Sequence, residues 1–101
     1  MTVAYLVVEM KISDPEKYKT YMAEAPASVK AFGGEYIVRG GRHEVLEGDW
    51  NPARVALLRF PSYEQAKAFY DDQQYTQTRA KRAGATEYFN MVLVEGVDAP
   101  V

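Results

Sequence analysis

The stretch that decides the fold runs Val3-Ala4-Tyr5-Leu6-Val7-Val8-Glu9-Met10-Lys11-Ile12 and continues into Asp14-Pro15-Glu16. Residues 3–12 are rich in β-branched and aromatic side chains, which favour a strand. Asp14 is a typical helix N-cap, Pro15 suits the first helical position, and Glu16 suits the first turn. The pattern therefore predicts a strand that passes directly into a helix.

Both faces of this predicted strand are apolar. One face carries Ala4, Leu6, Val8, Met10 and Ile12, and the other carries Val3, Tyr5 and Val7. A sheet with one solvated face alternates apolar and polar residues, which this strand does not do. The predicted last strand, residues 88–95, is also apolar on both faces. We therefore expect helices to cover one face and a second copy of the chain to cover the other, as a homodimer; the alternative is a monomer with an exposed apolar patch.

The remaining elements follow in the order β-α-β-β-α-β. Helical spacing after Asp14 extends to Gly33-Gly34, and Pro26 predicts a kink there or a break into two short helices. Gly40-Gly41 predicts a bulge, after which residues 43–47 continue the extended chain. The other predicted elements are strands at 35–39 and 54–60, a helix capped by Ser62 and Gln65, and a further helical stretch at 75–83. This order predicts an α+β ferredoxin-like fold, a four-stranded antiparallel sheet with helices on one face.

The size and composition fit one small globular domain. The chain has 101 residues, which predicts a single domain at residues 1–96 and a C-terminal tail at 97–101. The net charge of −2 argues against nucleic-acid binding, and the absence of cysteine excludes disulfides and thiolate metal sites. There is neither a leader pattern nor a run of roughly 18 apolar residues, so we expect a cytoplasmic protein that does not enter a membrane.

Several motifs resemble one bacterial family, domain of unknown function 1330. The motifs that carry the resemblance are Asp14-Pro15 with Tyr18 and Tyr21, Gly33-Gly34, Val38-Arg39-Gly40-Gly41, Leu46-Glu47-Gly48-Asp49-Trp50, Arg59-Phe60-Pro61-Ser62, Ala66, Tyr70, Tyr75, Arg79 and Glu95-Gly96. They span nearly the whole chain. One departure is Asp71-Asp72-Gln73, where the family pattern has a serine close before the tyrosine.

The resemblance implies a dimeric α-β barrel, in which two sheets stack and each subunit has a pocket between its sheet and helices. Relatives by fold include cofactor-free quinol-type monooxygenases, muconolactone isomerases, haem-using chlorite dismutases and structural proteins. The family itself has no settled activity, and a shared fold does not determine function.

His43 and Arg39 are the candidate catalytic residues. His43 is the only histidine, and its imidazole could act as a general base near neutral pH, serve as a single metal ligand, or simply face solvent. With a single histidine, a histidine-rich metal site is excluded, and we expect no metal and no cofactor. Arg39 lies beside two glycines and could hold a carboxylate or enolate, or pair with Glu9, Glu35 or Glu47.

Aromatic residues and a second arginine are the candidate ligand-binding residues. Tyr21 and Tyr70 lie on predicted buried helix faces, while Tyr75 and Arg79 share a helix face one turn apart. Trp50 lies in a polar turn, where a large aromatic side chain is expected to pack against the pocket or a neighbouring subunit. Each has an ordinary alternative: core packing for the tyrosines, an interface anchor for Trp50, and for Arg79 an ion pair with Asp71 or Asp72.

Together these residues predict a pocket for a small aromatic or carboxylated molecule. One hypothesis is a cofactor-independent monooxygenase or isomerase in which arginines hold an anionic oxygen and His43 moves protons. The other is a non-catalytic binding or structural dimer whose charged residues form interfacial salt bridges.

Overall fold

A computed structural model describes residues 2–101. Met1, the first residue of the predicted domain 1–96, lies outside the described residues. The elements in chain order are β1 (Ala4–Ile12), α1 (Pro15–Ala31), β2 (Glu35–Arg39), β3 (Arg54–Phe60), α2 (Tyr63–Asp71), α3 (Gln73–Ala80) and β4 (Thr86–Glu95). The predicted element order is confirmed, with α3 shifted towards its N-terminus and β4 starting two residues early.

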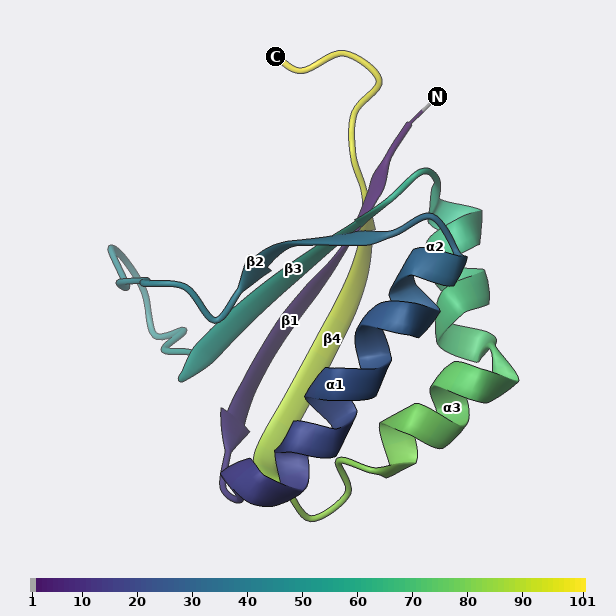
Figure 1. Ribbon diagram of the computed structural model, residues 1–101. Helices are drawn as coiled ribbons and strands as arrows, with labels where there is room; N and C mark the ends of the chain where they lie inside the picture. The colour runs from purple at the N-terminus through teal and green to yellow at the C-terminus, as the bar shows by residue number, and fades with distance from the viewer. Residues whose placement is uncertain (1) are drawn as a thin grey trace.

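The four strands form one antiparallel sheet in the order β2-β3-β1-β4. All three helices lie on the same side of this sheet, and the other side carries no helix (Figure 1). This is the ferredoxin-like arrangement predicted from the element order. In this article the side covered by α1, α2 and α3 is called the helix face, and the opposite side is called the open face.

Side-chain caps determine where the helices begin. Asp14 accepts a hydrogen bond from the Lys17 backbone N–H at 3.1 Å, and Ser62 accepts one from the Gln65 N–H at 3.1 Å. The predicted capping box is only half formed, because the Gln65 side chain donates to the Phe32 carbonyl instead of the Ser62 backbone. Asp72 ends α2 and caps α3, which explains why the helical region divides there.

Helix α1 is continuous through Pro26, so the predicted break into two helices is wrong. A proline has no N–H, and at this position it leaves the Met22 carbonyl, four residues earlier, without its helical donor. The Arg39 guanidinium supplies the missing donor, with 2.7 Å between its Nη2 and the Met22 oxygen. A tertiary hydrogen bond from β2 thus replaces the one that the proline removes.

The β-bulge lies earlier than predicted. The register between β2 and β3 shifts between Tyr36 and Val38, and not at Gly40-Gly41. Tyr36 is opposite Leu58 and Arg39 is opposite Ala56, and both partners are buried on the helix face. The extra residue therefore turns Arg39 to the same side as Tyr36, three residues away.

Residues 40–53, here called the arm, connect β2 to β3 without forming a strand. The prediction that residues 43–47 continue an extended strand is wrong, because no strand is formed there. Gly40 donates its backbone N–H to the Val55 carbonyl at 2.9 Å, which is the last hydrogen bond between the two strands. Its φ is positive, at 73°, and the chain leaves the sheet at this residue. The arm projects from the end of β2 and β3 in Figure 1.

The hydrophobic core lies between the sheet and the helices. Its buried members are, from the strands, Leu6, Val8, Met10, Ala56, Leu58 and Phe60, from the helices, Tyr18, Tyr21, Ala25, Val29, Ala66, Phe69 and Tyr75, and, from the loop before β4, Ala85. On the open face, Val92 and Val94 remain 59% and 46% exposed. No helix in the described part of the chain has the length and apolar character needed to cross a membrane.

Candidate functional site

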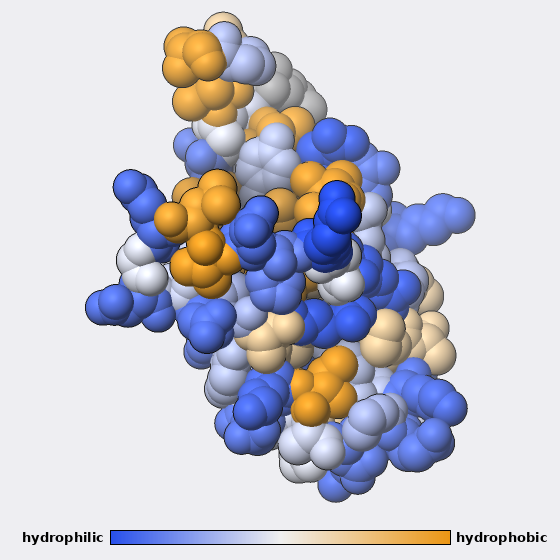
Figure 2. All heavy atoms as spheres, turned by 90° about the vertical axis from the view of Figure 1, so that its left-hand side faces the viewer, coloured by the Kyte–Doolittle hydropathy of each residue, from blue (hydrophilic) through white to orange (hydrophobic). Residues whose placement is uncertain are grey.

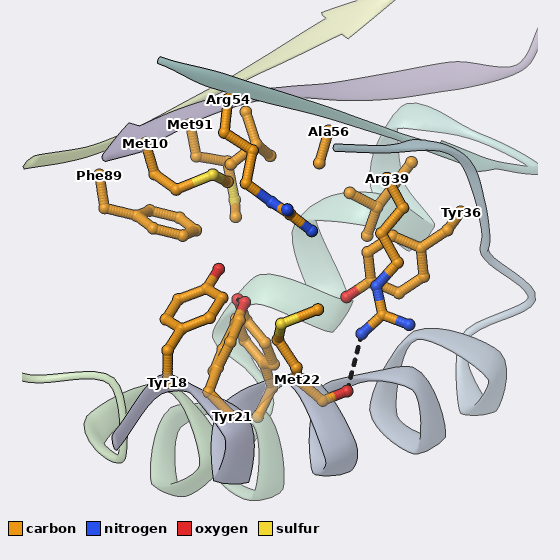
Figure 3. A pocket seen from close by; sticks show the side chains of 13 residues that line it. Met10, Tyr18, Tyr21, Met22, Tyr36, Arg39, Arg54, Ala56, Phe89 and Met91 are labelled. Atoms are coloured by element: carbon orange, nitrogen blue, oxygen red, sulfur yellow. Dashed lines mark hydrogen bonds between the residues drawn. The ribbon is translucent and has the colours of Figure 1, made fainter. Parts of the chain in front are cut away.

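A small cavity lies between α1 and the helix face of the sheet (Figure 3). Its volume is about 30 Å³, which is enough for about one water molecule. Besides Val8, Ala56, Leu58 and Phe89, its lining has four tyrosines (Tyr18, Tyr21, Tyr36, Tyr75), two arginines (Arg39, Arg54) and three methionines (Met10, Met22, Met91). The cavity and these lining side chains are called the pocket from here on.

The two arginines give the pocket a positive charge. Its lining residues, all within the described chain, include no Asp or Glu. Arg39 lies 4.6 Å over the Tyr36 ring and donates to the Met22 carbonyl. Arg54 reaches from β3 towards α1 (Figure 3) and forms no ion pair with a described residue. Its guanidinium packs against Gly40, where an added Cβ would collide with it.

The pocket tyrosines are hydrogen-bond donors at neutral pH. Burial raises the pKa of Tyr36 to about 12 and raises the pKa of Tyr18 and Tyr21 as well. The Tyr21 and Tyr75 hydroxyl oxygens lie 2.7 Å apart, and Arg82 donates to the Tyr75 oxygen at 3.3 Å. Together with the arginines, these groups provide donors and positive charge, which suit an anionic oxygen atom.

Three of the predicted site residues, Arg39, Tyr21 and Tyr75, meet at the pocket. His43 does not: it lies on the arm, where its Nε2 is 2.8 Å from the Pro52 carbonyl. It faces a separate cleft of about 310 Å³. That cleft shares Met10 and Arg54 with the pocket, so these two side chains form the wall between them.

The other three predicted residues lie outside the pocket. Trp50 is 58% exposed and donates from its indole Nε1 to Glu9 on β1 at 2.9 Å, which places it on the open face. Arg79 stacks 4.0 Å over the Tyr70 ring and donates to the Tyr70 carbonyl at 3.1 Å. It thus holds the junction of α2 and α3.

The ion pairs expected for the two arginines are not formed. Asp71 and Asp72, the expected partners of Arg79, have other roles: Asp71 pairs with Lys67, and Asp72 caps α3. The three acids expected near Arg39 are also not its partners, since Arg59 pairs with Glu35, and Glu9 accepts from Trp50 and Asn90. No ion pair within residues 2–101 includes Glu47.

Arg54 is the pocket residue that a finer analysis of the pattern could have found. It lies in phase with Ala56, Leu58 and Phe60, which are all buried. An arginine in step with buried apolar positions places its side chain on the core side of the sheet, where a charge is costly unless it has a partner. Arg82, by contrast, follows the end of α3, and no periodic pattern marks it.

The described chain offers no grouping of histidine, cysteine, aspartate or glutamate side chains that could hold a metal ion. The pocket lining contains no cysteine or histidine. It brings arginine and tyrosine donors together around one cavity, which suits a small anion.

Solved structures similar to this chain share its fold. A protein of unknown function from Rhodopseudomonas palustris has a TM-score of 0.73 at 16% identity, covering 97% of this chain and 85% of that one. A dimeric ferredoxin-like protein of unknown function from Thermobifida fusca has a TM-score of 0.59 at 10% identity, covering 95% and 92%. SnoaB, a cofactor-independent oxygenase from Streptomyces nogalater, has a TM-score of 0.62 at 9% identity, covering 98% and 97%.

No curated protein matches the chain. At these identities, the structural similarity establishes the ferredoxin-like fold alone. Residues 3–97 match the family described as Domain of unknown function (DUF1330). This match covers nearly the whole chain, and the resemblance found in its motifs is confirmed: the chain belongs to the DUF1330 family.

Proposed function

We propose that this protein is a homodimer that binds a small aromatic anion, such as a carboxylate or phenolate, in the pocket of each subunit. The observation that carries the proposal is the convergence of Arg39, Arg54 and the tyrosine hydroxyls on one cavity without a carboxylate in its lining. Arg39 is exposed and Arg54 is half-buried, so both guanidinium groups can be reached by a ligand at the pocket. A ligand anion would supply the missing partner.

The pocket must open to admit such a ligand, because about 30 Å³ holds only water. Its three methionines are unbranched and adapt their shape readily, so they are suited to this change. Two larger hollows adjoin it: the His43 cleft of about 310 Å³ through Met10 and Arg54, and a cleft of about 400 Å³ through Phe89 and Met91. Movement of Arg54 and Met10 would join the pocket to the first hollow.

A second candidate is catalysis as a cofactor-independent monooxygenase or isomerase. The observation that favours it is the position of His43 just beyond Arg54. Because the Pro52 carbonyl can only accept, the neighbouring His43 Nε2 carries the proton in this contact, and Nδ1 of the neutral ring is free to act as a base. The oxygenase named among the structural neighbours supports the same chemistry.

The homodimer is supported by the open face. Figure 2 shows hydrophobic side chains on this side of the molecule, set among hydrophilic ones. Val7 lies at its centre, paired with Leu57 on β3 and Val92 on β4. Exposed apolar groups on the arm, including Leu46 at 84% and Trp50 at 58%, add to this surface. A second copy would cover what the helices do not.

Calorimetric titration with benzoate, and with neutral benzyl alcohol as the matched probe, tests the binding proposal. We expect the wild-type dimer to bind benzoate and not benzyl alcohol. Arg54→Gln should weaken benzoate binding by about tenfold or more, the effect of losing one hydrogen bond to a charged group. Lys19→Gln removes a cation from the exposed side of α1 and should leave binding unchanged. Equal affinity for the two probes would contradict an anion site.

The catalytic candidate has its own measurement, which is oxygen consumption with a quinol substrate, together with proton exchange in a lactone. His43→Asn should abolish either activity while leaving benzoate affinity intact. Binding without turnover would leave the non-catalytic dimer as the function.

A further inference from the structure

We infer that Tyr21 is the hydroxyl that donates to the bound anion, and that Arg82, outside the pocket, positions and polarises it through Tyr75. This inference rests on the proposed anion binding, and it names the residues that would favour an anionic oxygen over a neutral one. Arg82 is absent from the pocket lining. It is therefore a positioning residue.

The direction of the hydrogen bonds carries the inference. Arg82 Nη1 lies 3.3 Å from the Tyr75 oxygen and can only donate to it. Tyr75 is fully buried at 0% exposure, so its own hydroxyl proton needs an acceptor, and the Tyr21 oxygen lies 2.7 Å away. We therefore assign the donation in this pair from the Tyr75 hydroxyl to the Tyr21 oxygen. The Tyr21 oxygen accepts this bond, and its own proton is left to point elsewhere.

The free proton of Tyr21 has one place to go. Tyr21 is 6% exposed and lines the pocket, pointing from α1 towards the strands (Figure 3). No other described residue accepts a hydrogen bond from its hydroxyl. An acceptor atom of a ligand in the pocket would complete the chain Arg82→Tyr75→Tyr21→ligand.

The cation at the far end of this chain is held without a counter-charge. The Arg82 guanidinium lies 3.6 Å over the Phe89 ring and 4.8 Å over the Tyr21 ring. It forms no ion pair with any described carboxylate. An unpaired guanidinium polarises the hydroxyl it donates to, and successive hydrogen bonds strengthen one another inside a protein. The Tyr21 hydroxyl is thereby oriented to donate into the pocket.

The geometry of the relay is held by packing. Tyr75 stacks on Phe69 with 4.2 Å between ring centroids, and Tyr21 packs edge-on against both Tyr75 and Phe89. The relay therefore joins α3 to α1 through side chains that have little freedom to rotate. A donor fixed in this way favours an anionic oxygen over a neutral one, because it does not reorganise to receive the charge.

The probe for this inference is 4-nitrophenol, whose visible absorbance shows whether the bound molecule is a phenolate. We expect the wild-type protein to bind the phenolate and to shift the ionisation of the bound probe to lower pH. Tyr21→Phe should weaken phenolate binding by about tenfold, as for a lost bond to a charged acceptor. Tyr75→Phe and Arg82→Gln should each weaken it by about threefold, within the range of one neutral hydrogen bond.

The decisive comparison is the double variant Tyr75→Phe with Arg82→Gln. If Arg82 acts through Tyr75, the double variant binds phenolate no more weakly than either single variant. Additive losses would overturn the relay, because Arg82 would then act independently of Tyr75. Lys81→Gln removes a neighbouring cation that pairs with Glu24 and should change nothing.

Two further outcomes separate this inference from the proposed function. If Arg54→Gln abolishes phenolate binding while Tyr21→Phe leaves it unchanged, the relay is wrong and the anion pocket stands. If wild-type protein binds neither phenolate nor benzoate, both are wrong. Should Arg82→Gln fail to fold, Tyr75→Phe, which removes a single oxygen, tests the same relay, and Arg82→Lys should retain part of the affinity.

Discussion

The helix face and the open face of the sheet are both apolar, but only one of them is covered by its own chain. On the helix face, Leu6 and Val8 of β1 are 2% exposed, whereas Val92 and Val94 of β4 are 59% and 46% exposed on the open face. β1 and β4 are neighbours in the sheet, and along each of them the residues of the helix face alternate with those of the open face. The difference shows which face of the sheet is covered by the helices of the same chain and which face is left exposed.

The two faces also differ in whether their charged groups have partners. On the helix face, arginines and tyrosines surround a cavity without a carboxylate. On the open face, Glu9 is already satisfied by Trp50 at 2.9 Å and Asn90 at 3.1 Å. Unpaired charge thus lies where a small ligand would bind, and paired charge lies where a protein surface would pack.

The largest effect should follow from truncating Phe69, at the centre of the helix face. Phe69 is 1% exposed and packs against Phe60 with 5.1 Å between ring centroids. Phe69→Ala should lower the free energy of unfolding by about 3–5 kcal/mol, the usual cost of removing a buried phenylalanine. Urea denaturation followed by circular dichroism measures it. A loss below 1 kcal/mol would show that this face is not the stabilising core.

The matching change on the open face should alter assembly and leave the fold intact. In the monomer, the carboxylate of Val92→Glu would remain in water. In a dimer it would be buried without a partner, which should weaken the free energy of association by several kcal/mol. Light scattering after size exclusion at micromolar concentration should therefore show dimer for the wild type and monomer for the variant. Asn90→Ala, on the same face, is the milder control. A wild-type protein that elutes as a monomer would contradict the contrast between the faces.

The sequence pattern predicted the elements well and the pocket incompletely, for physical reasons. Strand bounds at 35–39 and 54–60 follow from local alternation, which a short window contains. The side to which Arg39 points depends on a bulge that no glycine marks. The continuity of α1 at Pro26 depends on Arg39, which lies 17 residues after Met22, the residue whose carbonyl it bonds. Interactions of that kind are tertiary, and local propensity does not encode them.

Arg39 tests how far the helix face depends on its polar contacts. Arg39→Ala leaves the Met22 carbonyl without a donor and should lower the free energy of unfolding by about 1–3 kcal/mol. Pro26→Ala restores the backbone N–H that can bond this carbonyl within α1. In the Pro26→Ala background, the loss from Arg39→Ala should therefore fall below about 1 kcal/mol, which a double-mutant cycle measures. Equal losses in both backgrounds would contradict this role of Arg39.

Alkaline pH tests the burial of the pocket tyrosines on the helix face. Burial raises the pKa of Tyr36 from 10.0 to about 12, so the folded state holds this proton more tightly than the unfolded chain. The stability from this group is fully present below pH 10 and is lost as the pH rises towards 12. Tyr36→Phe should flatten part of this decline in unfolding free energy. An unchanged slope would indicate that Tyr36 is solvated in the folded protein.

The smallest expected effect is a gain, at the one described buried side-chain oxygen without a hydrogen-bond partner. Ser28 lies on the buried side of α1 at 2% exposure, and its Oγ has no partner. Ser28→Ala removes the unsatisfied group and favours the helix, so it should raise the free energy of unfolding by about 1 kcal/mol. Ala27→Ser, on the exposed side of the same turn, isolates the helix-propensity part and should lower stability by about 0.5 kcal/mol. A destabilising Ser28→Ala would contradict this prediction. It would indicate that a water molecule bonds the Ser28 hydroxyl in solution.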